Sequence, residues 1–227
     1  MSLTREDLEN GVMLRLWQEH NRHLPCKTHA QLDADADAAL ASYGPGDPWI
    51  FGYGSLIWNP LLDFAERRPA TLEGFHRRFC LWSKTGRGTP ERPGLMLGLD
   101  DGGMCRGVAF RIPRDKACCE FRLLWRREMI SDSYTARWLP AHTAEGEVRV
   151  LTFVINPKNA NYAGQLSMEQ MVETIATGGA GRLGTSRDYL CQTVDALLEH
   201  GVNDPFLDEL HSRINAQAAM ESPDTGD

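Results

Sequence analysis

The chain has 227 residues, of which 42% are hydrophobic and 24% are charged, and its formal net charge is −7. This length and composition fit one globular domain with a sizeable hydrophobic core. The negative charge disfavours nucleic-acid binding, and the sequence has no run of about 20 apolar residues that would predict a membrane span.

The cellular location is predicted from the start of the chain and from its cysteines. The first residues lack the basic and then apolar pattern of a signal peptide. The six cysteines show neither a C-x-x-C pair nor a spacing typical of metal ligands. Free thiols in a reducing compartment, and hence a cytoplasmic protein, are the expectation.

The first part of the chain is predicted to be a helical extension. Leu8, Val12 and Leu16 lie about one helical turn apart, Asp alternates with Ala in residues 33–40, and Pro25 separates the two stretches. The run Gly44–Pro48 breaks regular structure and marks the boundary. We therefore expect an extension over residues 1–47, a main domain over 48–215 and a flexible tail over 216–227.

Strand patterns outnumber helix patterns in the main domain. The expected strands are Trp49–Phe51, Gly74–Ser83, Gly94–Leu99, Arg106–Ile112 and Val148–Ile155, with glycine-rich turns between several of them. The expected helices are Asp115–Ile130, Ser167–Thr177 and Ser186–His200, the last with Thr185 or Ser186 as N-cap and Gly201 at C′. This order predicts an α+β fold with a mixed sheet or a small barrel.

A glycine turn follows the first expected strand, in the sequence Gly52-Tyr53-Gly54-Ser55-Leu56-Ile57. Glycine at both positions permits a positive φ and leaves the backbone amides uncovered, so the turn could hold a carboxylate or phosphate. It lacks the third glycine of a dinucleotide fingerprint, the Gly-Lys-Ser/Thr of a Walker loop and the second glycine of a nucleophile elbow. An ordinary tight turn and an anion-binding nest both remain compatible with it.

A carboxylate is expected on the apolar face of the helix predicted over Asp115–Ile130. Phe121, Leu124, Trp125 and Glu128 follow the spacing i, i+3, i+4, i+7 and share one face of a helix. Loss of solvent there would raise the pKa of Glu128 and favour a role in general acid/base catalysis. A glutamate paired with a nearby arginine is the alternative.

Two further residues have both a structural and a functional interpretation. Arg87 lies between glycines in a predicted loop, where it could meet a substrate carboxylate or simply face solvent. Tyr134 follows the helix that carries Glu128, so its phenol could lie near the carboxylate or only contribute packing.

Several motifs in order resemble the ChaC family of γ-glutamylcyclotransferases. The resemblance spans about Trp49 to Tyr189, and the extension before it resembles bacterial members. The motifs are Phe51–Pro60, Gly74–Cys80, Arg87–Pro90, Pro93–Gly94, Gly107–Arg111 and Leu124–Met129.

The resemblance implies a small mixed β-barrel flanked by helices, the γ-glutamylcyclotransferase-like fold. It implies cleavage of glutathione to 5-oxoproline and cysteinylglycine without a metal or other cofactor. The family's catalytic glutamate falls on Glu128. The substrate pocket falls on the turn Gly52–Ile57, with further contributions from Arg87 and Tyr134. Some relatives have Gly-Gly-Tyr after the glutamate, where this chain has Asp132-Ser133-Tyr134.

Two other functions stay open at this point. A related cyclotransferase could act on other γ-glutamyl amino acids or on γ-glutamylamines. A non-catalytic binding module connected with the regulation of cation transport is the second alternative, and it would tolerate substitution of Glu128.

Overall fold

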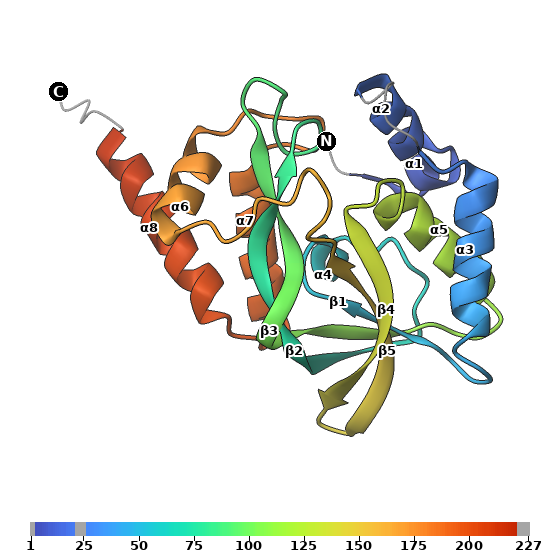
Figure 1. Ribbon diagram of the computed structural model, residues 1–227. Helices are drawn as coiled ribbons and strands as arrows, with labels where there is room; N and C mark the ends of the chain where they lie inside the picture. Colours follow the sequence, from blue (N-terminus) through green and yellow to red (C-terminus); the bar gives the residue numbers. More distant parts are fainter. Residues whose placement is uncertain (1–2, 21–25, 222–227) are drawn as a thin grey trace.

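The computed structural model describes residues 3–20 and 26–221 (Figure 1). Helices α1–α3 precede the first strand, α5 lies between β3 and β4, and α6–α8 follow the last strand. The helices are α1 (Arg5–Glu9), α2 (Val12–His20), α3 (His29–Ala41), α4 (Ser55–Trp58), α5 (Ala117–Glu128), α6 (Met168–Thr177), α7 (Ser186–Glu199) and α8 (Pro205–Glu221). The strands are β1 (Trp49–Gly52), β2 (Glu66–Ser83), β3 (Gly94–Arg111), β4 (Tyr134–Thr143) and β5 (Gly146–Ile155).

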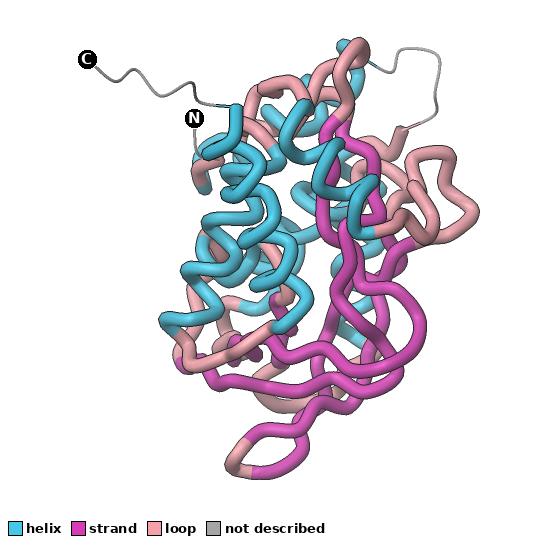
Figure 2. The backbone as a smooth tube through the Cα atoms, turned by 90° about the vertical axis from the view of Figure 1, so that its left-hand side faces the viewer, coloured by secondary structure: helices cyan, strands magenta, loops and turns pink. Residues whose placement is uncertain are grey.

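The five strands close into a barrel, which confirms the predicted α+β barrel architecture. β1 pairs antiparallel with β3 and parallel with β5, and the order continues from β3 through β2 and β4 back to β5. Figure 1 shows α6, α7 and α8 beside the long β2–β3 hairpin and the N-terminal helices on the other side of the barrel. The turned view in Figure 2 shows the strands as a continuous group beside the helices.

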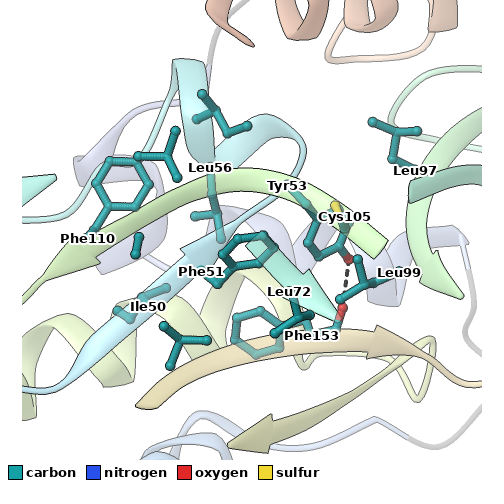
Figure 3. Packing of buried hydrophobic residues seen from close by; sticks show 14 of the residues in the cluster. Ile50, Phe51, Tyr53, Leu56, Leu72, Leu97, Leu99, Cys105, Phe110 and Phe153 are labelled. Atoms are coloured by element: carbon teal, nitrogen blue, oxygen red, sulfur yellow. Dashed lines mark hydrogen bonds between the residues drawn. The ribbon is translucent and has the colours of Figure 1, made fainter. Parts of the chain in front are cut away.

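Aromatic and branched side chains from several strands make up the buried core on the two faces of the sheet. Phe51 from β1, Phe110 from β3 and Phe153 from β5 are fully buried (Figure 3). The phenol of Tyr53 enters the same core and donates a hydrogen bond of 2.7 Å to the carbonyl of Phe153. This bond satisfies the polar tip of a tyrosine in an otherwise apolar core and ties the glycine turn to β5.

Helix boundaries follow local capping. Thr4, Thr28, Ser167 and Thr185 each cap a helix N-terminus, and in each case the N3 side chain returns a bond to the cap backbone. Thr185 is therefore the N-cap of α7, and Gly201 follows its end with φ +66°. Both observations agree with the sequence-based prediction.

The long hairpin β2–β3 differs from the prediction. The stretches expected as separate strands, residues 94–99 and 106–112, belong to the single strand β3, apart from Ile112, which follows its end. Gly102 and Gly103, expected to form a turn, have φ of +96° and +70°, and the opposing register shifts at Gly74 with φ +81°. The glycines therefore produce an irregularity inside a continuous ladder rather than a reversal.

Three elements were not predicted, namely the four-residue helix α4, the strand β4 and the helix α8. β4 alternates partly buried and exposed side chains in its first half, but Leu139 and Pro140 interrupt this alternation, and β5 pairs with the strand along its whole length. α8 starts with Pro205, and the Asp204 side chain accepts a bond from the Leu207 amide, an arrangement typical of a capped N-terminus. This helix runs to Glu221, so residues 216–221 are helical rather than a flexible tail, and residues 222–227 lie outside the described part.

The N-terminal helices attach to α5 through ion pairs. Asp33 and Asp37 of α3 pair with Arg126 and Arg122 of α5, while the intervening Leu32, Ala36 and Leu40 are buried. The alternation of Asp and Ala therefore gives α3 one apolar edge and one acidic edge. Gly11, with φ +67°, separates α1 from α2, and Pro25 lies outside the described residues.

A buried ion pair fixes α1. Arg5 donates two hydrogen bonds, of 2.7 and 2.9 Å, to the carboxylate of Glu120, which is 1% exposed. The Glu120 carboxylate also accepts a hydrogen bond from the Asp63 amide at 3.1 Å.

None of the helices in the described ranges combines the length and the hydropathy that crossing a bilayer requires.

Replacing Arg5 by Met is expected to lower the free energy of unfolding because it leaves the Glu120 charge buried and poorly paired. A fully buried pair typically costs ~3–5 kcal/mol to break, and the Arg5 side chain is 38% exposed, so we expect about 2 kcal/mol. Denaturant unfolding of Arg5→Met and of the control Lys27→Met, whose exposed pair with Asp35 contributes about 0–1 kcal/mol, measures the difference. Equal losses in the two variants would contradict the stabilising role of the Arg5–Glu120 pair.

Candidate active site

A cavity of about 370 Å³ lies where α4, the end of α5, the start of α7 and the N-terminal segment meet. This volume is near the lower end of the range of about 300–1,000 Å³ that is usual for small-molecule sites. Of the residues singled out from the sequence, Ser55, Arg87 and Glu128 line it. The cavity therefore joins three segments that are far apart in the sequence.

The glycine turn reaches the cavity through Ser55. β1 ends at Gly52, and α4 begins at Ser55, so the turn places the Ser55 hydroxyl directly at the cavity wall. The hydroxyl of Tyr189 on α7 packs closely against this turn at Gly54. The turn is thus held between β1 and α7.

The reason for glycine in this turn differs from the prediction. Neither Gly52 nor Gly54 has a positive φ, and Gly54 has φ −141°. A Cβ atom at Gly54 would lie 2.5 Å from the Tyr189 hydroxyl oxygen, and one at Gly52 would lie 3.1 Å from the Leu56 Cβ. Close approach of neighbouring groups, rather than a left-handed backbone, requires glycine at Gly54 and favours it at Gly52.

Glu128 is the last residue of α5 and lies on the predicted face of that helix. Phe121, Leu124 and Trp125 on the same face are buried in the core, and the Glu128 side chain is 17% exposed at the cavity. Burial raises the pKa of Glu128 above its usual value, and the adjacent Arg127 offsets part of this rise. The carboxylate is therefore well placed to accept and return a proton.

Arg127 connects the carboxylate to the glycine turn. Its Nε lies 3.0 Å from Glu128 Oε1, its Nη2 donates to Ser55 Oγ at 2.8 Å, and its Nη1 donates to the Asn59 carbonyl at 2.6 Å. The predicted alternative, a glutamate paired with a nearby arginine, is thus present together with the cavity position. One planar guanidinium fixes the relative positions of Glu128 and Ser55.

Arg87 brings a second positive charge to the cavity. The residue is only 5% exposed, and its guanidinium lies over the rings of Tyr189 and Trp58, 5.3 and 5.6 Å from their centroids. Burial lowers the pKa of the guanidinium, and the charge of Asp188 nearby opposes this effect without forming a direct ion pair with it. A buried cation that no carboxylate of the described chain contacts directly suits an anionic ligand group.

Six predicted substrate-binding residues do not line the cavity. Tyr53, Leu56 and Ile57 are buried in the core, and the Tyr134 hydroxyl donates to the Leu97 carbonyl at 2.9 Å. These residues lie behind the cavity wall and support it. The six are Gly52, Tyr53, Gly54, Leu56, Ile57 and Tyr134.

Three tyrosines, Tyr53, Tyr134 and Tyr189, are close enough to Glu128 for its charge to affect their pKa. Burial is the main cause that raises the pKa of Tyr53 and Tyr134, and it raises that of Tyr189 to about 12, with the Glu128 charge adding to the rise in each case. All three are therefore neutral phenols over the ordinary pH range.

The sequence motifs did not reveal several cavity residues. Tyr189 and Asp188 of α7 line the cavity, but they lie in an ordinary amphipathic helix pattern far from the other motifs. Trp58, at the end of α4, also forms part of the wall. The one sequence signal for Tyr189 is the glycine at Gly54, because a glycine in a turn can indicate that another group packs closely against the backbone. Within the described residues, no group of three or more His, Cys, Asp or Glu side chains is arranged to hold a metal ion.

Comparison with known proteins identifies the family. The family model described as "ChaC-like protein" matches residues 48–217, which is well over half of the chain. The chain belongs to this family. It is 38% identical over 180 residues to the glutathione-specific γ-glutamylcyclotransferase of Escherichia coli (strain K12), covering 79% of this chain and 78% of that protein.

Further similarity extends to eukaryotic proteins. The chain is 30% identical over 166 residues to glutathione-specific γ-glutamylcyclotransferase 1 of Mus musculus, covering 70% of this chain and 74% of that protein. A crystal structure of a γ-glutamylcyclotransferase specific to glutathione from yeast superposes with a TM-score of 0.68 at 24% identity, covering 76% of this chain and 97% of that one. The fold is therefore the γ-glutamylcyclotransferase-like fold, as the resemblance implied.

Substitution of Gly54 by Ala is expected to destabilise the protein by about 1–3 kcal/mol because the added Cβ overlaps the Tyr189 hydroxyl. When Tyr189→Phe is also present, the nearest remaining ring atom is 3.6 Å away, so the cost of Gly54→Ala should fall. A double-mutant cycle by denaturant unfolding measures this coupling. An unchanged cost of Gly54→Ala when it is combined with Tyr189→Phe would show that the overlap is not its cause.

Proposed function

We propose that this ChaC family member is a lyase that cleaves glutathione to 5-oxoproline and cysteinylglycine. The observation that carries the proposal is the pairing of a shielded Glu128 with the Ser55 turn in one cavity, connected by Arg127. The names of the relatives supply the substrate, since those of Escherichia coli and Mus musculus are both called glutathione-specific.

The reaction needs no external nucleophile. The α-amine nitrogen of the γ-glutamyl group attacks its own γ-carbonyl carbon and forms a five-membered lactam. The bond between that carbon and the cysteine nitrogen then breaks, and cysteinylglycine leaves with a proton on its new amine. Well-oriented intramolecular attack can contribute ~7–11 kcal/mol of the barrier reduction, so the main task of the protein is to hold the substrate folded.

Glu128 moves the proton in this mechanism. Its carboxylate takes a proton from the substrate ammonium, and the protonated acid then gives it to the departing cysteine nitrogen. General acid/base catalysis of this kind typically contributes about 10²–10⁴-fold. Burial raises the pKa of Glu128, and the charge of Arg127 opposes this rise and so favours the ionised form that accepts the proton.

Arg87 and the glycine turn position the substrate. Glutathione carries two carboxylates, and the buried Arg87 guanidinium would form an ion pair with one of them. This pair would offset the free energy that the guanidinium loses because it is shielded from water. The turn that ends at Ser55 would contact the γ-glutamyl part, because Ser55 lies on the same guanidinium as Glu128. Tyr134 would act through its neighbours, since it does not line the cavity.

A cytoplasmic location is part of the proposal. The six cysteines form no disulfide, as expected for a reducing compartment, where glutathione is also the common thiol. The proposed steps use only the substrate and the side chains named here.

The first test is an assay for 5-oxoproline and cysteinylglycine with purified protein and glutathione. Replacement of Glu128 by Gln should lower turnover by at least about 10²-fold, because Gln cannot transfer the proton. The midpoint of thermal unfolding of this variant at pH 7 should not fall, since a raised folded-state pKa means that the ionised carboxylate opposes folding above that pKa.

The matched control is Glu173→Gln, which changes an exposed glutamate on α6 and should leave turnover unchanged. A folded wild-type protein that forms neither product would end the proposal. A competition assay between glutathione and other γ-glutamyl amino acids or γ-glutamylamines distinguishes a glutathione-specific enzyme from a related cyclotransferase with another substrate. A ligand that binds but is recovered unchanged, with tolerance of Glu128→Gln, would support the regulatory binding module.

The pH dependence of kcat/KM should show an acid limb above the usual pKa of a glutamate. The base must be ionised, so activity is lost as the pH falls through the raised pKa of Glu128. Arg127→Met should move this limb to higher pH because the opposing charge is gone, and Arg127→Lys should return it toward the wild-type position. A limb at the same pH in wild type and Arg127→Met would exclude Glu128 as the titrating base.

A further inference from the structure

The N-terminal segment contributes part of the active-site wall. Leu3 and Met13 line the same cavity as Ser55 and Glu128, although both lie well before residue 48, where the match to the family model begins. Figure 1 shows α1 and α2 lying against α5, the helix that ends at Glu128. This chain therefore encloses the cavity with residues from outside the matched region.

The segment is held firmly in this position. Besides the Arg5 bonds to Glu120, the Arg5 guanidinium donates to the Leu61 carbonyl at 3.2 Å. The Asn59 side chain donates to the Leu3 carbonyl at 2.9 Å, and the Asn59 carbonyl accepts from Arg127. Leu3 is thus separated by only two hydrogen bonds from the guanidinium that orients Glu128.

The wall formed by this segment is thin and apolar. A second, much smaller cleft of about 20 Å³ shares Leu3, Met13 and Leu183 with the main cavity. On its far side this cleft is lined by Val12, Leu16 and Arg182, among others. The three shared side chains border both spaces, so we expect that shortening one of them would enlarge the main cavity toward the smaller cleft.

The cavity has a charged part and an apolar part. The ammonium and α-carboxylate of the γ-glutamyl group require Glu128, Arg87 and the Ser55 turn, all of which carry charge or hydrogen-bonding groups. The cysteine side chain of the leaving dipeptide is small and largely apolar. It matches the surface of Leu3, Met13 and Leu183, and methionine adapts well to such a contact because its side chain is flexible and polarizable.

From this arrangement we propose that Leu3 and Met13 form the leaving-group subsite, against which the cysteine side chain of glutathione rests, and that Met13 limits the size of the sulfur substituent accepted. The inference rests on the proposed function. It assigns to the N-terminal segment the choice of leaving group, whereas Glu128 and the glycine turn carry the chemistry on the γ-glutamyl group.

The test compares glutathione with S-hexylglutathione, using release of 5-oxoproline as a readout common to both substrates. Met13→Ala should raise the ratio of kcat/KM for S-hexylglutathione to that for glutathione by about 10-fold or more, the usual discrimination of an apolar pocket for extra methylenes. Met13→Phe should lower the same ratio because the larger side chain leaves less room in the cavity. The control is Leu14→Ala, on the same helix and partly buried against the core but not lining either space.

The outcomes separate the two proposals. A wild-type protein that releases no 5-oxoproline from glutathione would refute the proposed function. An active wild type, with Met13→Ala and Met13→Phe giving the same ratio as Leu14→Ala, would refute the leaving-group subsite and leave the proposed function intact. Opposite shifts of the ratio in Met13→Ala and Met13→Phe support the subsite, even if one of the variants is less stable.

Discussion

The Arg127 guanidinium is the group on which the site depends. It binds Glu128 through Nε, Ser55 through Nη2 and the Asn59 carbonyl through Nη1, so the end of α5 and the turn after β1 are fixed relative to each other. Arginine suits this role because its donors have a rigid planar arrangement and its charge persists when buried. The same charge limits the rise in the Glu128 pKa, so the interaction that builds the geometry also keeps the carboxylate usable as a base.

The site buries charged side chains, and burying a charge costs free energy unless another group compensates it. Glu128 has Arg127, whereas Arg87 rests on the faces of Trp58 and Tyr189 and forms no direct ion pair with a carboxylate of the described chain. Arg87 is therefore available to bind an anion, and Glu128 is available to transfer a proton. The N-terminal helices complete the enclosure, and their ion pairs with Glu120, Arg122 and Arg126 hold them to the helix that carries the acid.

Local patterns predicted elements well where one face is clearly buried. The period of Phe121, Leu124, Trp125 and Glu128 located α5 and the carboxylate on its apolar face. Thr185 or Ser186 was predicted as the N-cap of α7, and Thr185 is the one that caps it. Local patterns failed where pairing between distant segments determined the structure. The glycines at 102 and 103 look like a turn, but the ladder between β2 and β3 continues across them. β4, whose alternation is interrupted, forms a strand that pairs with β5 along its whole length.

The amino-acid sequence alone determined the α+β class, the position of Glu128 on an apolar helix face and the family, because these depend on short-range periodicity and on ordered motifs. Only the tertiary structure decided which residues meet at the cavity. Tyr189 against Gly54, Arg87 on Trp58, and Leu3 and Met13 in the wall are contacts between segments separated by tens of residues or more. Such contacts follow from how the barrel closes and how the helices dock on it, and no local sequence pattern carries that information.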